Sequence, residues 1–334
     1  MKILLTGAGG FVGSHILSHF LKNTRHEIVC ICSWKHRGAP YRILDDANYQ
    51  ANKERVKIIT HDLISPFTED VKNEIGFPDI IINIASESHV DRSITDPVPF
   101  IKNNVDLMLT MLEFAREVSP KLFLQFSTDE VYGQAPIGYN HREWSPIIPS
   151  NPYSASKASQ EALAISYWRT YKIPVIITNT MNVFGERQDK EKFIQLVIDK
   201  VQKGEKVTIH GYPDGKTAGS RFYIHARNVA DAILHIINTV NPSMYPDVDR
   251  PDRFNVVGEK EVDNLTLANL IASYVGKPLK YKMVDFHSSR PGHDCRYALD
   301  GEKLAKIGWT PKVSFEESLK RTVDFSLTQA QARV

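Results

Sequence analysis

The first half of the chain alternates short, almost wholly apolar runs with longer segments of helical periodicity. The apolar runs lie at residues 3–5, 28–31, 57–59, 80–82, 122–126 and 175–177. Runs of this kind are typical of strands buried on both faces, and helices are the usual connections between parallel strands. Because such connections form right-handed crossovers, the alternation predicts an α/β fold built on a doubly wound parallel sheet.

Two of the helical segments are long, Pro99–Val118 and Pro152–Tyr171. They carry more apolar residues than one buried stripe on each helix would use. These residues include Leu107, Met111, Leu112, Leu163 and Trp168. If two copies of the chain bury the excess, four helices form a self-complementary seam about a two-fold axis. The pattern therefore predicts a homodimer.

The composition narrows the class of protein. A chain of 334 residues, 42% of them hydrophobic, can bury a large core. The net charge of +2 favours neither a nucleic-acid nor a membrane partner. Cys30, Cys32 and Cys295 are too few and too irregularly spaced for a disulfide framework. Cys30 and Cys32 alternate with Ile31 on one apparent strand, so we interpret these two as buried or half-buried thiols. A reducing, cytoplasmic location fits best, and the pattern gives no metal site.

A glycine-rich turn follows the first apolar run. Gly7, Gly10 and Gly13 punctuate it, and Phe11 and Val12 begin the next helix. Glycine permits a tight turn and removes the Cβ atom that would block a pyrophosphate. The N–H groups at the start of the helix then face the phosphates. Between a first strand and a first helix, this turn predicts a dinucleotide site.

The end of the second apolar run bears on the type of dinucleotide. An acid that binds the adenosine ribose of NAD⁺ is expected there, but Cys32 and Ser33 occupy the position. Lys35 and Arg37 follow, which favours the 2′-phosphate of NADP⁺. Alternatively, the two cations form a solvated loop and NAD⁺ binds without the acid. Further candidates for cofactor contacts are Asp62 and Leu63, placed to cap the adenine, together with Ala85 and Asn103.

A tyrosine and a lysine lie four residues apart on the second long helix. Tyr153 and Lys157 therefore share a face. An ammonium close to a phenol stabilises the phenolate and lowers the pKa of the phenol. A tyrosinate of this kind can take a proton from a carbinol while a hydride leaves for nicotinamide. Thr128, at the end of the fifth apolar run, can hydrogen-bond the same carbinol.

Two adjacent carboxylates, Asp129 and Glu130, follow Thr128. In a cleft, burial and like charge push the two pKa values apart, so one group stays protonated and the other ionised. Eliminating water from a sugar needs both, a base for a C–H proton beside a carbonyl and an acid for the leaving hydroxyl. Ligands of open α/β sheets bind at the carboxyl ends of the strands, which is where this pair lies.

These motifs together carry a resemblance that extends from about residue 1 to residue 325. The glycine turn and the Tyr153–Lys157 pair resemble extended short-chain dehydrogenase/reductases. Within that superfamily, the chain is similar to nucleotide-sugar 4,6-dehydratases of the dTDP-glucose type. The segments that carry this similarity are residues 86–93, 127–133, 151–157 and 290–294. The Thr-Asp-Glu triplet is the specific feature, since related decarboxylases tend to have Ser-Glu there and 4-epimerases lack both acids.

The resemblance implies roles for individual residues. Thr128 and Tyr153 engage the 4-hydroxyl, Asp129 is the acid and Glu130 is the base. The nucleotide-diphosphate end of the substrate and its sugar are contacted by Ser88, His89, Asn182, Lys192, Arg221, Asn255, Arg290 and His293. The chain departs from the family pattern at the missing acid after the second strand, at Val183 and in the loop 211–220.

The residue composition and the pattern of expected elements change after Asn179. Glycine, proline and charged residues crowd its second half between shorter helical stretches. We expect a dinucleotide-binding Rossmann domain over residues 1–178, joined by 226–256. A smaller, irregular substrate-binding part would comprise residues 179–225 and 257–334 and would hold the nucleotide sugar.

The predicted activity is the conversion of an NDP-hexose, of the dTDP- or UDP-glucose type, into an NDP-4-keto-6-deoxyhexose. Hydride leaves C4, water is lost across C5 and C6, and the hydride returns to C6, so tightly bound NAD⁺ or NADP⁺ is regenerated in each turnover. The alternatives are a 4-epimerase and an NDP-glucuronate decarboxylase. A non-catalytic dinucleotide-binding redox sensor is a further alternative, although it would need none of the catalytic side chains.

Overall fold

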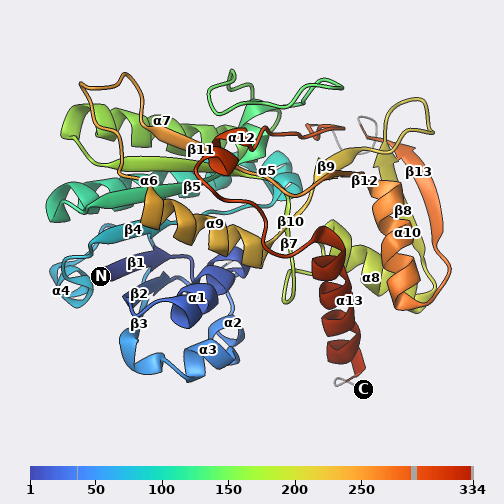
Figure 1. Ribbon diagram of the computed structural model, residues 1–334, viewed down its shortest axis with the longest axis horizontal. Coiled ribbons are helices and arrows are strands. Elements are labelled where there is room, and N and C mark those ends of the chain that lie inside the picture. The colour runs from blue at the N-terminus through green and yellow to red at the C-terminus, as the bar shows by residue number, and fades with distance from the viewer. Residues whose placement is uncertain (36, 287–291, 332–334) are drawn as a thin grey trace.

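A computed structural model describes residues 1–35, 37–286 and 292–331 of the protein (Figure 1). At its centre is a parallel sheet in the order β11-β6-β5-β4-β1-β2-β3. The seven strands are β1 (Lys2–Thr6), β2 (Glu27–Cys32), β3 (Val56–Thr60), β4 (Ile80–Asn83), β5 (Leu122–Thr128), β6 (Val175–Thr180) and β11 (Asp252–Val256). The chain order reverses between β1 and β4. The predicted doubly wound parallel sheet is confirmed.

The two faces of the sheet bury alternate side chains of the same strand. On β1, Ile3 and Leu5 join a core with α1 (Phe11–Asn23) and α9 (Ala226–Thr239). Leu4 points to the opposite face, which α6 (Pro97–Val118) and α7 (Pro152–Tyr171) cover. Because both faces are buried, the strands are apolar throughout, as the sequence indicated. Figure 1 shows these helices on either side of the sheet.

Short elements connect the strands of the sheet. Between β2 and β3 lie α2 (Tyr41–Leu44), α3 (Ala47–Gln50) and a 3₁₀ turn at Lys53–Arg55. Helix α4 (Glu69–Ile75) precedes β4, and α5 (Val90–Thr95) precedes α6. A second 3₁₀ turn, Asp129–Tyr132, follows β5 directly. That turn places both acids of the Thr-Asp-Glu triplet immediately beyond the end of a central strand.

The C-terminal part packs around a separate apolar cluster that includes Phe184, Val207, Leu267 and Leu319. Its helices are α8 (Phe193–Lys203), α10 (Asn264–Val275), α12 (Glu302–Lys306) and α13 (Phe315–Gln331). Its strand pairs are β7 (Val183–Phe184) with β10 (Ile224–His225), β8 (Lys206–Gly211) with β13 (Lys280–Asp285), and β9 (Ser220–Phe222) with β12 (Glu261–Asp263). The sequence predicted the longer helices here but none of these strands, because each pairs with only one neighbour and four of the six have only two or three residues.

The premise of the predicted helical seam does not hold within this fold. Of the five apolar residues taken as surplus, Leu107, Met111, Leu112 and Trp168 are between 0% and 4% exposed in a single chain. They pack against the sheet, and the indole Nε1 of Trp168 donates to the carbonyl of Ser243 at 2.8 Å. Only Leu163 is half-buried. The homodimer stays a prediction that needs a different argument.

Within the described ranges, no helix has both the length and the apolar character that crossing a bilayer requires. Cys30, Cys32 and Cys295 are buried thiols without a disulfide. The interpretation of Cys30 and Cys32 as buried thiols is therefore confirmed.

Candidate active site

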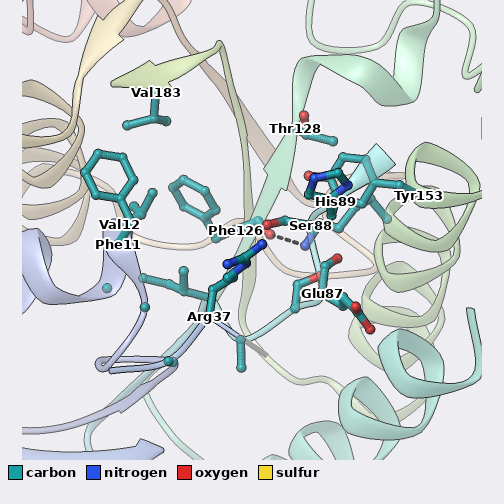
Figure 2. A pocket seen from close by; sticks show the side chains of 18 of the residues that line it. Phe11, Val12, Arg37, Glu87, Ser88, His89, Phe126, Thr128, Tyr153 and Val183 are labelled. Carbon is teal, nitrogen blue, oxygen red and sulfur yellow. Dashed lines mark hydrogen bonds between the residues drawn. The ribbon is translucent and has the colours of Figure 1, made fainter. Parts of the chain in front are cut away.

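A cavity of about 360 Å³ opens where several strands of the sheet end. Its wall follows the residues after β1, β2, β4, β5 and β6, so it lies where the chain order of the sheet reverses. Figure 2 shows Phe11 and Val12 on one side of the cavity and Thr128, His89 and Tyr153 on the other. Reversal points of doubly wound sheets form crevices because the connections on either side run to opposite faces.

Most of the residues predicted from the sequence line this one cavity. They are Gly7, Gly10, Phe11, Val12, Gly13, Ser33, Lys35, Arg37, Asp62, Leu63, Ala85, Ser88, His89, Asn103, Thr128, Asp129, Glu130, Tyr153, Lys157, Asn182 and Lys192. Of the other described candidates, Arg221, Asn255 and His293 do not belong to the lining. Arg290 lies outside the described residues.

The glycine turn forms a compact cradle at one end of the cavity. Gly7 has a φ of +69°, in the left-handed region that favours glycine. A Cβ atom on Gly13 would lie 2.2 Å from the carbonyl oxygen of Gly7, so this position admits no side chain. Gly10 is the N-cap of α1 and has no side chain that could cap the helix. The uncapped first turn therefore fits the phosphates of a dinucleotide.

Lys35 and Arg37, the two basic cavity residues that follow β2, are already paired. The ammonium of Lys35 contacts the carboxylate of Asp62, and the guanidinium of Arg37 contacts that of Glu191. These contacts engage the two cations whose presence favoured a 2′-phosphate. Each of the two cations therefore has a carboxylate partner in the protein alone.

Tyr153 and Lys157, the pair predicted to be catalytic, both lie on α7, but their electrostatics differ from the expectation. Lys157 Nζ donates to the carbonyl of Phe126 at 2.8 Å and to Gln160 Oε1 at 2.6 Å. Burial lowers the pKa of Lys157 to about 7. Burial, and then the charge of Glu130, raise the pKa of Tyr153, which a hydrogen bond with Thr128 opposes. The predicted lowering of the phenol pKa is therefore not seen in the protein alone, because burial of the phenol and then the charge of Glu130 raise it.

The acid pair is set into the wall beside Tyr153. Asp129 is 3% exposed, and its Oδ1 accepts a hydrogen bond of 2.9 Å from Thr128 Oγ1. Burial and the neighbouring Glu130 raise the pKa of Asp129. Burial also raises the pKa of Glu130, while a hydrogen bond from Asn151 and the charges of Arg221 and Lys192 oppose the rise. The pKa of Asp129 is raised by burial and also by its like-charged neighbour, whereas Glu130 has a hydrogen-bond donor and nearby cations that favour its carboxylate. The two acids are therefore suited to opposite roles.

Two residues that contact Glu130 were missed in the sequence. Asn151 Nδ2 and the hydroxyl of Tyr297 each lie 3.4 Å from Glu130 Oε2. Asn151 is the N-cap of α7 and also donates to the carbonyl of Gly292 at 3.0 Å. An asparagine before proline at a helix start was a visible signal for the cap, but not for a contact with Glu130. Tyr297 has no local signal, since a loop distant in sequence brings it to the site.

The predicted residues outside the lining serve other contacts. The guanidinium of Arg221 donates to the carbonyls of Ser220, Cys295 and Asp294 at 2.6–2.8 Å and lies over the ring of Tyr297. Asn255 Nδ2 donates to the carbonyls of His141 and Asp300 at 3.0 Å each, so this amide ties β11 to two loops.

His293, also outside the lining, faces a carboxylate. Its Nε2 lies 2.7 Å from Asp91 Oδ1. Asp91 is on α5, so this contact fastens a C-terminal loop to the helix that follows the His89 end of the cavity.

The fold and the cavity define the class of protein: an extended short-chain dehydrogenase/reductase with a site for a nicotinamide dinucleotide. The family model described as GDP-mannose 4,6 dehydratase matches residues 4–322. The chain therefore belongs to this family of nucleotide-sugar 4,6-dehydratases.

Curated relatives match over the whole chain. The low-salt glycan biosynthesis protein Agl12 of Haloferax volcanii is 34% identical, over 98% of this chain and 99% of that protein. The dTDP-glucose 4,6-dehydratase of Salmonella typhimurium is 33% identical, over 99% of this chain and 94% of that protein.

Solved structures share the fold. The dTDP-glucose 4,6-dehydratase of Streptomyces venezuelae with NAD and TYD bound has a TM-score of 0.85 at 30% identity and covers 99% of this chain and 98% of its own. The UDP-glucose 4-epimerase of Thermus thermophilus in complex with NAD has a TM-score of 0.86 at 26% identity and covers 98% of this chain and 99% of its own. The fold alone does not separate the two activities, so the side chains of the site must.

Proposed function

We propose that the protein converts an NDP-hexose, of the dTDP- or UDP-glucose type, into an NDP-4-keto-6-deoxyhexose. The observation that carries this proposal is the meeting of Asp129 and Glu130 with Thr128 and Tyr153 at one cavity wall. A 4-epimerase has no use for an acid and a base at this position, because it forms no alkene and loses no water. The relatives named as dTDP-glucose 4,6-dehydratases support the same reaction.

The dinucleotide would be held by the Gly7–Gly13 turn and the first turn of α1. When bound, its nicotinamide accepts and returns a hydride, and its positive charge favours the phenolate of Tyr153. Tyr153 then takes the proton of the C4 hydroxyl, which Thr128 Oγ1 orients. Lys157, with its ammonium held by Phe126 and Gln160, adds positive charge beside the phenol.

The acid pair performs the elimination once C4 is a ketone. The ketone acidifies the C5–H bond, and Glu130, held by Asn151 and Tyr297, removes that proton. Asp129 keeps its proton through burial and gives it to the C6 hydroxyl, which leaves as water. The C5–H electron pair forms the new C5–C6 double bond as the C6–O bond breaks and water leaves. The bound dinucleotide would supply the hydride that C6 needs, and a proton to C5 would complete the product.

The decisive experiment compares Glu130→Gln with Asp129→Asn. Without its base, Glu130→Gln should still oxidise C4, accumulate reduced cofactor absorbing in the near ultraviolet and exchange little solvent deuterium into C5. Asp129→Asn should still exchange the C5 proton but lose water slowly. The general base contributes about 10²–10⁴-fold, so the loss is measurable. Formation of the 4-keto-6-deoxy product by Glu130→Gln at close to the wild-type rate would refute the proposal.

A panel of sugar nucleotides followed by mass spectrometry identifies the substrate and tests the alternatives. Loss of one water supports the dehydratase, an unchanged mass with a changed sugar supports a 4-epimerase, and loss of carbon dioxide supports a glucuronate decarboxylase. Cofactor binding without turnover of any sugar nucleotide supports a redox sensor.

For the cofactor, we propose NAD⁺, tightly bound and regenerated in each turnover. The sequence favoured NADP⁺ because Lys35 and Arg37 follow the second strand, but Asp62 and Glu191 already pair with them. The solved relatives with NAD bound support this revision. Calorimetry with both dinucleotides on cofactor-free protein decides between them, and tighter binding of NADP⁺ would restore the first interpretation.

We further propose a homodimer through a revised surface on α6 and α7. Two rows of half-buried or exposed residues remain at four-residue spacing, Ile101, Val105 and Leu109 on α6 and Leu163, Tyr167 and Tyr171 on α7. Such rows would form a self-complementary interface about a two-fold axis. A monomer mass by light scattering at micromolar concentration would contradict it.

We also propose that residues 226–256 belong with residues 1–178 as the dinucleotide-binding domain. Helix α9 packs on the same sheet face as α1, and β11 pairs with β6 along its whole length. The substrate-binding part is then 179–225 with 257–334. Hydrogen exchange should show α9 and β11 protected together with β6, and exchange of β11 together with α10 and α13 instead would contradict this division.

A further inference from the structure

A line of buried polar side chains crosses the interior of the sheet beneath the cavity. Thr6 on β1, Asn83 on β4, Gln125 on β5 and Gln160 on α7 are each 0% exposed. Thr6 Oγ1 lies 2.8 Å from Asn83 Oδ1, and Asn83 Nδ2 lies 2.8 Å from Gln125 Oε1. Gln125 Nε2 then lies 3.1 Å from Gln160 Oε1, the atom that also receives Lys157 Nζ. The line thus joins the strand before the glycine turn to the catalytic lysine.

The direction of these hydrogen bonds is set at the Thr6 end. A hydroxyl has one proton and two lone pairs. Thr6 Oγ1 accepts from the N–H groups of Ile84 and Ala85 at 3.0 Å each, so both lone pairs are used. Its proton must go to an acceptor, which is Asn83 Oδ1. Asn83 consequently turns its NH₂ group toward Gln125.

The orientation of Asn83 fixes which ends of the Gln125 and Gln160 amides act as donor and acceptor, as far as Lys157. Gln125 accepts from Asn83 through Oε1 and donates through Nε2 to Gln160. Gln160 must therefore present its oxygen on that side, while its Nε2 donates to the carbonyl of Asn104 at 2.8 Å. A reversed Gln160 amide would place its NH₂ group against two other donors, Gln125 Nε2 and the Lys157 ammonium. The contacts of Gln160 Nε2 and of Gln160 Oε1 therefore both require the amide oxygen to face the lysine.

The consequence for Lys157 is a fixed position. Its ammonium has three donors, and the carbonyl of Phe126 and Gln160 Oε1 take two of them. The remaining donor is available at the cavity, which Lys157 lines. Since Lys157 is 3% exposed, water does little to stabilise its charge, and these two oxygens supply most of the direct hydrogen bonding.

We infer that Gln160 is a positioning residue for Lys157, and that a directional line of buried hydrogen bonds from Thr6 holds its oxygen toward the ammonium. The inference rests on the catalytic role proposed above for Lys157. It adds that β1, which precedes the glycine turn, and α7, which carries Lys157, are coupled through side chains as well as through the backbone of the sheet.

The test measures the titration of Lys157 directly, by NMR of protein labelled at lysine Cε. The Lys157 signal is assigned by its loss in Lys157→Met, and it stands apart because burial lowers the pKa of this lysine to about 7. Gln160→Glu places a carboxylate on the ammonium and should raise the pKa of Lys157 by about one pH unit or more. Gln160→Leu removes the oxygen and should lower the pKa. Opposite shifts of the Lys157 pKa in these two variants would show that Gln160 positions the lysine. A general loosening of the helix would not produce opposite shifts.

Matched variants separate the line from Gln160 alone. Thr6→Val removes the proton that starts the line and should move the Lys157 titration in the direction of Gln160→Leu, by a smaller amount. Thr6→Ser keeps the hydroxyl and should restore the wild-type titration. Gln195→Leu, at a buried glutamine of α8, is the control for deleting a buried amide and should not move it.

Two results would overturn the inference. An unchanged Lys157 titration in folded Gln160→Glu would show that Gln160 does not position the lysine, even if Gln160→Leu fails to fold. An unchanged titration in Thr6→Val, beside a changed one in Gln160→Glu, would show that no directional line reaches Gln160. The titration needs no substrate, so its outcome is independent of the sugar-nucleotide panel that tests the proposed dehydration.

Discussion

The two ends of the candidate active-site cavity are built in different ways. At the glycine-turn end, backbone forms the surface, and the charged side chains nearby, such as Lys35 and Arg37, are 58% and 54% exposed. At the other end, which we propose to be catalytic, the buried side chains of Thr128, Asp129 and Tyr153 form the surface, and further buried polar groups hold them. The shape of the glycine-turn end depends on glycines that lack a Cβ atom. The shape of the other end depends on hydrogen bonds that hold buried polar side chains in place. Substitutions should therefore have different effects at the two ends.

The largest effect is expected behind the catalytic end, at a buried ion pair. Arg253 Nη2 lies 2.8 Å from Glu161 Oε2 in an orientation that makes an ion pair but no hydrogen bond, and both side chains are 0% exposed. Glu161 also accepts from Ser127 and Asn179, beside the catalytic strand end. Arg253→Met leaves the buried Glu161 carboxylate without an opposite charge and should lower the free energy of unfolding by about 3–5 kcal/mol.

Urea denaturation at pH 7 measures this loss, and the double variant Arg253→Met with Glu161→Leu is the control. Removing both charges should recover a large part of the stability, because buried pairs are often replaceable by apolar residues. A single variant that loses less than about 1 kcal/mol would show that the catalytic end does not depend on this support.

The next largest effect concerns pH, at the helix beneath the glycine turn. Burial, and then the charge of His225, lower the pKa of His15 from 6.5 to about 4. Between these two values the unfolded chain binds a proton that the folded chain does not, so stability falls as the pH drops from 6.5 toward 4. The loss from this one group is on the order of 2–3 kcal/mol.

Urea midpoints at pH 7 and pH 4.5 should therefore differ less in His15→Gln than in the wild type. The remaining buried histidines keep part of the pH dependence in both proteins. An identical difference in the two proteins would show that His15 is protonated in the folded state.

At the glycine turn itself, a single methyl group should matter. The Cβ atom of Gly13→Ala would lie 2.2 Å from the carbonyl oxygen of Gly7. Relief of the clash must move the backbone that cradles the phosphates, so we expect about 1–3 kcal/mol of lost stability and dinucleotide affinity weakened at least about tenfold. Calorimetry and urea denaturation measure the two quantities.

Gly301→Ala is the matched control in the C-terminal part. There the new methyl meets only the side chain of Val257, at 3.2 Å, and a side chain can shift. Its cost should stay below that of Gly13→Ala. Equal effects in the two variants would mean that the shape of the glycine turn is not special to that end of the cavity.

The smallest effect is expected for the exposed cations at the same end. Lys35→Ala and Arg37→Ala remove surface ion pairs, which contribute about 0–1 kcal/mol each. NAD⁺ affinity should change less than about fivefold, and the ratio of NADP⁺ to NAD⁺ affinity should stay nearly constant. A selective loss of NADP⁺ binding of tenfold or more would show that these side chains do read a 2′-phosphate.

Most of the sheet and the cavity wall could be predicted because the signals are local. Apolar runs, glycine spacing and the four-residue interval from Tyr153 to Lys157 each depend on neighbouring residues. Helix α7 begins and ends at the predicted residues, Pro152 and Tyr171. The position of Asp129 and Glu130 followed from the general rule that parallel sheets bind ligands at their carboxyl edge.

What failed or was missed depended on contacts between distant segments. Trp168 looked like a surplus surface residue because the local sequence does not reveal Ser243, whose carbonyl accepts a hydrogen bond from its indole. Lys35 and Arg37 looked like phosphate ligands because their partners, Asp62 and Glu191, lie 27 and 154 residues away. Tyr297 gave no signal, although it contacts Glu130.

The sequence by itself determined the parallel sheet, the glycine turn and the set of reactive groups, because backbone geometry and side-chain chemistry are properties of short segments. Only the tertiary structure decided the protonation tendencies of those groups. The pKa of Tyr153 is raised and that of Lys157 is lowered because folding removes both from water and places Glu130 beside the phenol. Burial and electrostatic neighbours are set by the packing of strands and helices far apart in the chain, so no local pattern encodes them.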